Sequence, residues 1–354
     1  MAFTGINKST DYFNTKIYTG NGSAGHAITG VGFQPDWVWI KTRADVNNHT
    51  IFDAVRGVTK RIRSNQTNAE STSSGVTSFD SDGFTVGSDS AGNSGTMVSW
   101  NWKANGAGSS NTDGTINTTA TSVNTTAGFS ISTYSGTGSA ATIGHGLGAV
   151  PQVMIVKNTY QSESWIVYHQ SLGGGTPQDK YLHLNTTDAE GDSAAMWNDT
   201  APTSSVFSVG TSTSTNQAGG TFVAYCFAGK QGFSKFGSYT GNGNASDPPF
   251  IYTGFKPNFV MVKKYNGTQS WVMTDLVRDN AVGGGGNGIG ARLQAQSSAA
   301  EDSNDTWAAI NKFSNGFQPM YNDDVTNGSG STYIFMAFAA APLVGTNNIP
   351  ANAR

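Results

Sequence analysis

Hydrophobic and polar positions alternate along residues 97–104, and this alternation predicts a β-strand. Val98, Trp100 and Trp102 stand at every second position, with Ser99, Asn101 and Lys103 between them. A period of two, with one apolar and one polar side, is typical of a strand that buries one face and leaves the other in water.

The segments 222–229 and 333–340 keep the apolar side of this pattern but change the other side. The changed positions are Ala224 and Cys226 in the second segment and Phe335 and Ala337 in the third. Burial of a large apolar side chain is worth about 1.5–3 kcal/mol. We therefore expect a loop, another repeat or another subunit to cover this side, with Cys226 and Phe335 at the interface and Cys226 slow to react.

These strands belong to a unit that occurs three times in the chain. A Gly-x-x-Pro turn that leads into an apolar strand ending in lysine occurs at residues 32–41, 148–157 and 254–263. Twelve residues after each lysine stands Asp53, His169 or Asp275, and an Ala-Glu pair follows at Glu70, Glu190 or Glu301. A fixed order of this kind indicates one folding unit used three times.

The repeats set the expected domain boundaries. We expect a lead-in over residues 1–12, repeats over 13–104, 128–230 and 231–343, a linker over 105–127 and a tail over 344–354. The linker is rich in Gly, Ser, Thr and Asn, and residues 115–123 within it suggest one exposed strand. This longer spacer permits the first repeat to be set differently from the other two.

Short strands between frequent turn residues predict an all-β fold. The strands after each repeated proline are apolar on both sides, as central strands are. Helical signals are weak, and only residues 306–313 suggest a turn or two of helix. The favoured architecture is three tandem β-sandwich modules of jelly-roll-like form.

Composition excludes several functional classes. Charged residues make up 12% of the 354 residues and the net charge is −3, which does not favour binding to nucleic acid. No apolar run approaches the roughly 18 residues of a membrane span, and residues 1–10 show no secretory signal pattern. The single cysteine, Cys226, excludes an internal disulfide framework.

The candidates for chemistry all have structural interpretations. Asp53 with Arg56, and Asp275 with Arg278, share the pattern Asp-x-Val-Arg, which predicts a local ion pair. The second repeat replaces this pattern, and the repeated glutamates have no recurring partner acid, so we expect caps or turn anchors rather than general acid–base chemistry. We predict no catalytic residue, no metal ligand and no cofactor; the clustered acids of residues 188–192 are the one local exception to test.

Trp197 and Trp307 are the candidate ligand contacts. Both follow the repeated glutamate within polar, loop-like sequence. An aromatic plane on a loop can stack on a sugar ring, whereas a repeated tryptophan more often fills a core or an interface. We carry sugar stacking as the functional hypothesis for both.

The chain resembles a family of repeat-bearing proteins of marine tailed bacteriophages that are described as virion structural, tail-fibre-like or lectin-like. The resemblance rests on segments such as YFNTKIYTGNG, GFQPDWVWIK, TSFDSDGFTVGS, NTTAGFSISTYSGTG and the ending YIFMAFAAAPLVGTNNIPANAR. It implies a protein of the virion surface that is made in the host cytoplasm without a signal peptide.

Three functions stay open from the sequence. The first is a non-enzymatic tail-fibre or tail-associated protein that binds a receptor, with host-surface glycan as a candidate ligand, other virion proteins as partners and a homo-oligomer, a trimer favoured, as the assembly. The second is a capsid decoration protein. The third is a tail depolymerase that cleaves host polysaccharide.

Overall fold

The computed structural model describes residues 4–281, 288–303, 307–342 and 344. The described residues form antiparallel sheets with only short helices, so the all-β prediction is confirmed. The helices are α1 (Ser90–Asn93), α2 (Ala194–Trp197), α3 (Thr213–Asn216) and α4 (Leu276–Ala281), with 3-10 turns at Ser9–Asp11, Leu172–Gly174 and Pro177–Asp179. Most of the predicted tail and the first three residues of the lead-in lie outside the described residues.

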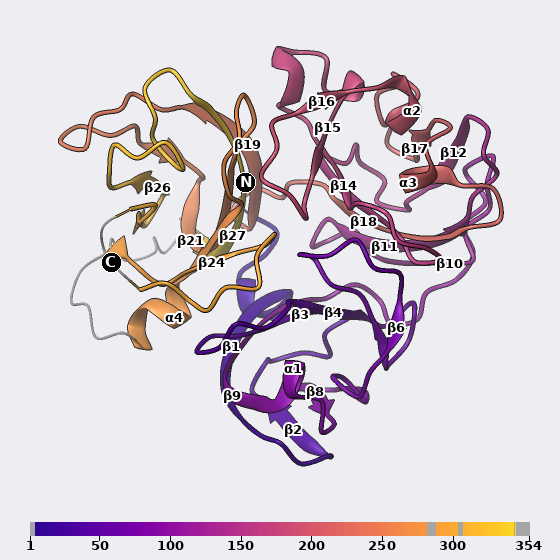
Figure 1. Cartoon of the computed structure of the whole chain (residues 1–354), viewed down its shortest axis with the longest axis horizontal. Helices are drawn as coiled ribbons and strands as arrows, with labels where there is room; N and C mark the ends of the chain where they lie inside the picture. Colours follow the sequence, from indigo (N-terminus) through magenta and orange to yellow (C-terminus); the bar gives the residue numbers. More distant parts are fainter. Residues whose placement is uncertain (1–3, 282–287, 304–306, 343, 345–354) are drawn as a thin grey trace.

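Each sequence repeat contributes one large sheet with the same central strand order. The order is β1 (Phe13–Asn21), β9 (Ser94–Trp102), β3 (Trp37–Thr42), β4 (Thr50–Asp53) in the first repeat; β11 (Phe129–Ser135), β18 (Thr221–Phe227), β13 (Val153–Asn158), β14 (Ile166–His169) in the second; and β19 (Ser234–Thr240), β27 (Thr332–Pro342), β21 (Phe255–Lys264), β22 (Val272–Asp275) in the third. In Figure 1 the three sheets form three lobes around a common centre.

Further strands extend the second and third large sheets. The second gains β10 (Ala120–Asn124), β15 (Lys180–His183) and β16 (Gly191–Asp192), and the third gains β24 (Arg292–Gln294). Because β10 lies in the segment expected as a linker, that part of the linker is an edge strand of the second repeat, with Thr121 and Ser122 buried rather than exposed.

A smaller sheet packs on the outer face of each large sheet. These sheets are β2 (His26–Thr29), β8 (Gly83–Val86), β7 (Ser78–Asp80); β12 (Ala141–Gly144), β17 (Val206–Val209); and β20 (Ile251–Tyr252), β26 (Gly316–Pro319), β25 (Ile310–Phe313), β23 (Gly288–Ile289), with a separate pair β5 (Lys60–Arg61), β6 (Ser71–Thr72). The helix expected at 306–313 is wrong, since 310–313 is strand β25. Each pair of layers encloses its own apolar cluster.

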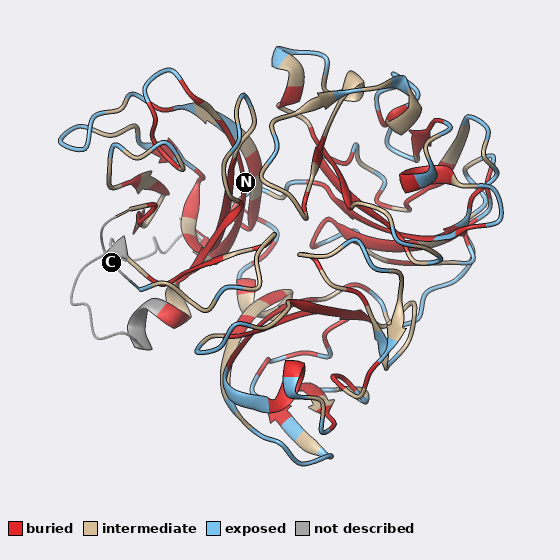
Figure 2. Cartoon of the chain, viewed as in Figure 1, coloured by how far each residue is buried: buried red, intermediate tan, exposed pale blue. Residues whose placement is uncertain are grey.

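The inner faces of the three large sheets share one core. Trp37 of the first repeat stacks on Tyr225 of the second at 4.5 Å between ring centroids, and Phe13 stacks on Phe338 of the third at 5.0 Å. Phe227 and Phe338 join the second repeat to the third at 5.9 Å. Figure 2 shows the buried strands on the inner side of each lobe. All three repeats contribute side chains to this one core. That each repeat is an independent module therefore stays a prediction.

The polar side of β9 is buried, contrary to the expectation of a water-facing side. Ser99 and Asn101 are both fully buried. The Asn101 amide donates to the main-chain oxygens of Asn14 and Ser99 and to the Ser99 hydroxyl, at 3.0 to 3.2 Å. Internal hydrogen bonds replace water here, so a polar pattern does not by itself mark an exposed face.

The repeated Gly-x-x-Pro turn depends on its glycine. Gly32, Gly148 and Gly254 have φ values of 92°, 65° and 83°, which side chains other than glycine rarely adopt. The turn sends the following strand into the centre of its sheet, so all three repeated lysines reach a junction between repeats.

Candidate functional site

The repeated lysines lie buried at the junctions between repeats. Lys157 donates to the carbonyl oxygens of Thr67 and Glu163, both at 3.0 Å, and Lys263 donates to that of Thr187 at 3.0 Å. Lys41 donates to main-chain oxygens of its own repeat. Burial lowers the pKa of Lys41 and of Lys157 to about 8 and that of Lys263 to about 7. The hydrogen bonds show that these side-chain nitrogens serve as internal donors, while burial disfavours their charged form.

Main-chain hydrogen bonds at the repeated glutamates join the repeats into a closed ring. The amide of Glu70 donates to Thr159 at 3.0 Å, that of Glu190 to Tyr265 at 2.8 Å, and that of Glu301 to Arg43 at 2.7 Å. The bonds lead from the first repeat to the second, from the second to the third, and from the third back to the first. The glutamates thus anchor the contacts between neighbouring repeats, which we call seams, as the turn-anchor interpretation expects.

The predicted Asp–Arg pairs are present and buried. Asp53 contacts Arg56 at 2.6 Å, and Asp275 contacts Arg278 at 2.5 Å. Each arginine also meets the glutamate of its own repeat at 3.1 Å. Burial alone would raise the pKa of Asp275, but the Arg278 guanidinium and its amide hold that pKa below the usual range. Asp275 is thus an ionised partner of Arg278 rather than a proton donor.

Each of these acids also accepts a hydrogen bond from the inner face of another repeat. The Tyr225 hydroxyl donates to Asp53 at 2.7 Å, and the Trp100 indole donates to Asp275 at 3.0 Å. The equivalent inner-face residue of the third repeat is Met336, which has no such donor.

In the second repeat, the residues that follow β14 and lie near Met336 are uncharged. His169 accepts from the amide of Ser171 through Nδ1, at 3.2 Å, so Nε2 carries the proton and donates to the Phe335 carbonyl, also at 3.2 Å. Burial lowers the pKa of His169 to about 4. Leu172, fully buried, stands where the other repeats have arginine, and Glu190 instead accepts from the amide of Gly173 at 2.9 Å.

The acids of residues 188–192 do not converge. Asp192 pairs with Lys180 at 2.7 Å, Asp188 accepts from the Thr186 hydroxyl, and Glu190 faces Gly173. Within the described ranges, no three His, Cys, Asp or Glu residues are grouped so that they could hold a metal ion. Nor does the described part of the chain contain a helix of the length and hydropathy that a membrane crossing requires.

Trp197 cannot stack on a sugar. Its side chain is 1% exposed, its indole donates to the Lys180 carbonyl at 3.0 Å, and its ring meets Tyr168 edge-on. Trp307 is partly exposed, and the Arg292 guanidinium lies 3.9 Å from the centre of its ring. The stacking hypothesis is therefore wrong for Trp197, which fills a core. For Trp307, which has a cation over one face of its ring as Tyr252 does, stacking stays a prediction.

Cys226 and Phe335 are buried, as expected, but the smaller sheet of their own repeat covers them. Cys226 packs in the cluster under β12 and β17, and Phe335 packs edge-on to Phe317 of β26. Burial raises the pKa of the Cys226 thiol to about 12. The contact between repeats is on the opposite side of these strands, where Trp100, Tyr225 and Met336 lie. The prediction of an interface between repeats or subunits at Cys226 and Phe335 is therefore wrong.

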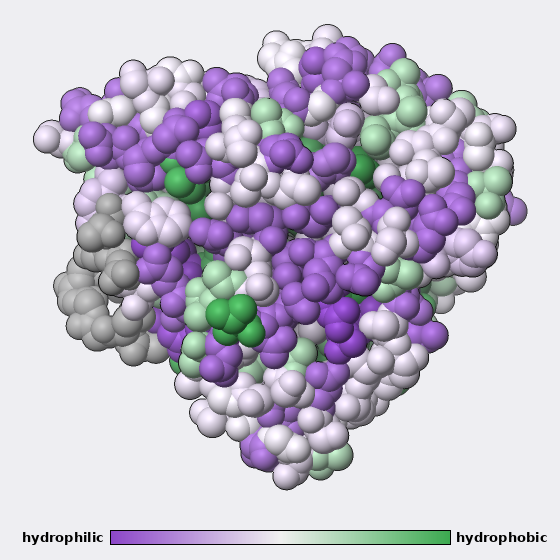
Figure 3. All heavy atoms as spheres, viewed as in Figure 1, coloured by the Kyte–Doolittle hydropathy of each residue, from purple (hydrophilic) through white to green (hydrophobic). Residues whose placement is uncertain are grey.

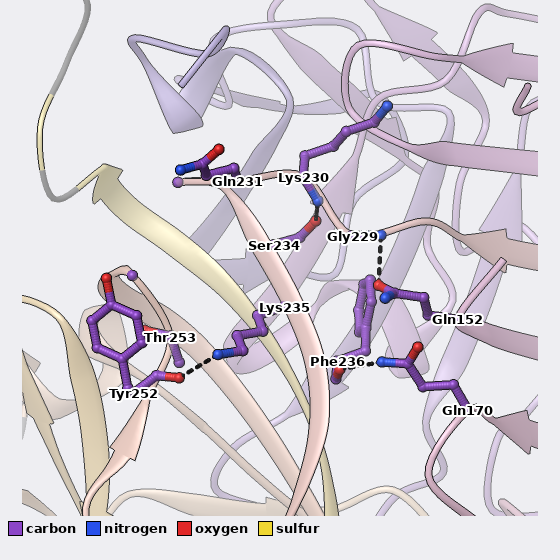
Figure 4. A pocket seen from close by; sticks show the side chains of 12 residues that line it. Gln152, Gln170, Gly229, Lys230, Gln231, Ser234, Lys235, Phe236, Tyr252 and Thr253 are labelled. Atoms are coloured by element: carbon purple, nitrogen blue, oxygen red, sulfur yellow. Dashed lines mark hydrogen bonds between the residues drawn. The ribbon is translucent and has the colours of Figure 1, made fainter. Parts of the chain in front are cut away.

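An open cleft of about 390 Å³ lies at the seam between the second and third repeats. Gln152 and Gln170 enter it from the second repeat, and Lys235 and Tyr252 enter it from the third (Figure 4). The Gln152 side chain accepts from the amide of Gly229 at 2.9 Å, and Gln170 donates to the Phe236 carbonyl at 2.7 Å. These bonds fix the two amide groups at the cleft wall.

Tyr252 provides an aromatic surface beside these amides. Its side chain is 49% exposed. Lys235 donates to the Tyr252 carbonyl at 2.7 Å, and its ammonium lies 5.2 Å from the centre of the Tyr252 ring. The cleft thus combines an aromatic plane, amide groups and an ammonium group, which are the groups that recognise hydroxyl-rich ligands.

A second hollow of about 300 Å³ adjoins the cleft and shares Lys230 and Gln231 with it. Thr125 and Thr126, from the end of the predicted linker, line its other side. Sequence reasoning missed both hollows because segments far apart in the chain form them, from residues 4–6 to residues 252–254. The sequence offers one signal for the cleft: the residue after the repeated proline changes from Asp36 in the first repeat to Gln152, a cleft residue, in the second.

The fold and these contacts define an all-β protein whose repeated sheets surround one core. The chain belongs to the family described as "Domain of unknown function (DUF7483)", whose model matches residues 8–342. A comparison with curated proteins gives no match.

Proposed function

We propose that this protein is a non-enzymatic component of a phage virion surface, tail-associated, which binds host-surface glycan in the cleft between its second and third repeats. The cleft carries the proposal, because the exposed Tyr252 ring stands beside fixed amide groups and an ammonium group. Such a lining can bind sugar hydroxyls and stack on a sugar ring without any group that cleaves a bond.

The contacts of the repeated acids between neighbouring repeats support a role in recognition rather than in hydrolysis. The repeated acids bind arginine side chains, and the repeated glutamates anchor main chain at the seams. A rigid scaffold that presents a preformed cleft binds with little loss of conformational entropy.

The surface character bears on how the protein behaves before assembly. The face seen in Figure 3 is mostly hydrophilic, with small and scattered hydrophobic patches. Such a surface suits a protein that stays soluble until it assembles on a particle. A homo-trimer remains part of the proposal, and the mass of the purified protein measured by light scattering tests it.

A glycan array of host-surface polysaccharides tests the binding function. The wild-type protein should bind at least one glycan, and Tyr252→Ala should weaken that binding by about tenfold or more, as loss of a central aromatic contact does. Tyr160→Ala is the matched control, because Tyr160 is 62% exposed and does not line the cleft. No binding by the wild type, or equal loss in both variants, would contradict the proposal.

Two measurements separate the alternatives. New reducing ends released from the bound polysaccharide, and abolished in Glu190→Gln, would establish the depolymerase instead. A copy number that matches capsid lattice positions, with the labelled protein on the head of the particle, would establish capsid decoration.

A further inference from the structure

The two hollows at the seam form one groove. They share Lys230 and Gln231, and their volumes of about 390 and 300 Å³ are each within the range of roughly 300–1,000 Å³ of small-molecule sites. A ligand that fills both must pass Lys230. The groove therefore fits an oligomer better than a single small ring.

The charged residues that line the groove are all basic. Lys230 and Lys235 line it, and none of the described residues that line either hollow is acidic. This contrasts with the whole chain, whose net charge is −3. A positively charged groove in a weakly acidic protein attracts an anionic ligand to that place.

The two lysines differ in what holds them. Lys235 is tied to the Tyr252 carbonyl. For the Lys230 ammonium, the described part of the chain supplies no hydrogen-bond or ion-pair partner, while its main-chain amide is held by Ser234. In Figure 4 the Lys230 side chain extends away from the paired groups. Lys230 is thus positioned, and its charge is left for a ligand.

We propose that the groove binds an oligosaccharide that carries carboxylates, such as a uronic acid polymer, with a carboxylate on Lys230 and a sugar ring on Tyr252. The inference rests on the proposed glycan-binding function and names its ligand class. A carboxylate on ammonium gives a charge-assisted hydrogen bond. The fixed amides of Gln152 and Gln170, and Thr125 and Thr126 in the second hollow, supply partners for hydroxyl groups.

Calorimetric titration of the full chain with a defined oligouronate tests the proposal. The probes are the oligouronate, the same oligosaccharide with its carboxyl groups reduced to alcohols, and a poly-glutamate peptide. The variants are Lys230→Gln and, as a matched control, Lys60→Gln, which removes a half-exposed charge that lies outside both hollows. Thermal unfolding of each variant checks that its fold is kept.

The expected result is oligouronate binding that weakens with salt and falls about tenfold or more in Lys230→Gln but not in Lys60→Gln. The reduced oligosaccharide should bind more weakly and be indifferent to Lys230→Gln. Equal binding of the acidic and reduced forms would overturn this inference and leave the glycan-binding function standing. Binding of poly-glutamate with the same dependence on Lys230 would overturn the sugar assignment, and no binding to any glycan would overturn both.

Discussion

The segment after the repeated Asp or His position, which we call the corner, differs between the third repeat and the second: the helix α4 follows β22, and the 3-10 turn Leu172–Gly174 follows β14. In the third repeat, Asp275 and Arg278 are buried together and Trp100 of the first repeat donates to the acid. In the second, His169 and Leu172 occupy the same places and face the Met336 strand. The charged corner occurs where the neighbouring repeat supplies a hydrogen-bond donor.

This difference shows that the residues on the two sides of a seam are matched: a buried acid on one repeat lies opposite a hydrogen-bond donor on the next. A buried carboxylate needs several hydrogen bonds to offset its lost hydration. Where Met336 offers none, a neutral imidazole bonded to a carbonyl and an amide avoids that cost. The second repeat therefore lacks the Asp-x-Val-Arg pattern because the third repeat places Met336, which has no hydrogen-bond donor, beside it.

Removal of Arg278 should produce the largest effect. Arg278→Leu, which installs the residue of the second repeat, leaves Asp275 buried without its main partner, and breaking such a pair costs about 3–5 kcal/mol. Chemical denaturation measures the loss in the free energy of unfolding. Adding Asp275→His should recover part of it, and Lys8→Ala, in an exposed pair, should change little. A loss below about 1 kcal/mol in Arg278→Leu would show that the pair is dispensable.

Removal of the Tyr225 hydroxyl should have the next largest effect. Tyr225→Phe deletes a hydrogen bond to the buried Asp53 carboxylate and should cost about 1.5–3 kcal/mol. Tyr134→Phe is the control, because the Tyr134 hydroxyl donates to the neutral carbonyl of Thr215, a bond worth about 0.5–1.5 kcal/mol. The reverse ranking in denaturation experiments would refute the matched seam.

Acid should destabilise the two corners in different pH ranges. The pKa of His169 is lowered to about 4, so between the ordinary value of roughly 6.5 and 4 the unfolded chain binds a proton that the folded one does not. Stability then falls with pH by up to about 1.4 kcal/mol per unit. His169→Gln should flatten part of this slope, since His49, with a pKa of about 3, contributes as well.

Asp275 should act only at lower pH. Its pKa is held below the usual range, so its stabilising effect is complete above the ordinary value of about 3.9 and is lost as pH falls through the folded value. Denaturation curves across pH measure both ranges. An unchanged slope between pH 4 and 6.5 in His169→Gln would contradict the neutral, buried imidazole.

Glu190→Gln should have the smallest effect, below about 0.5 kcal/mol. Glu190 accepts from the amide of Gly173, and a glutamine oxygen can do the same. Glu301→Gln should cost more, because Glu301 pairs with both Arg43 and Arg278. Equal losses in denaturation would mean that the arginine pairs add nothing to the third corner.

The strands were predictable, and their surroundings were not. The apolar runs behind each proline correctly predicted β3, β13 and β21, because central strands are buried on both sides. The covered side of β9 escaped prediction because the buried Asn101 amide nitrogen donates to the Ser99 hydroxyl and to main-chain oxygens in place of water. Trp197 has the polar neighbours of a loop residue, but its ring turns into a core.

The cleft and the shared core depend on contacts between distant segments. Each repeat is long enough to enclose a core of its own, so its length gave no sign of the common one. The cleft joins residues near 152, 170, 235 and 252, and no single stretch of sequence carries its chemistry.

Closure of the ring has a consequence for synthesis. Arg43 and Asn47, near the start, bond to Glu301 and Ser298, near the end. In a growing chain, the aromatic residues that face the third repeat, such as Phe13 and Trp102, therefore stay uncovered until Phe338 of β27 leaves the ribosome. Such uncovered residues invite aggregation while they wait. Nascent chains that stop before the third repeat should thus be the forms that chaperones retain.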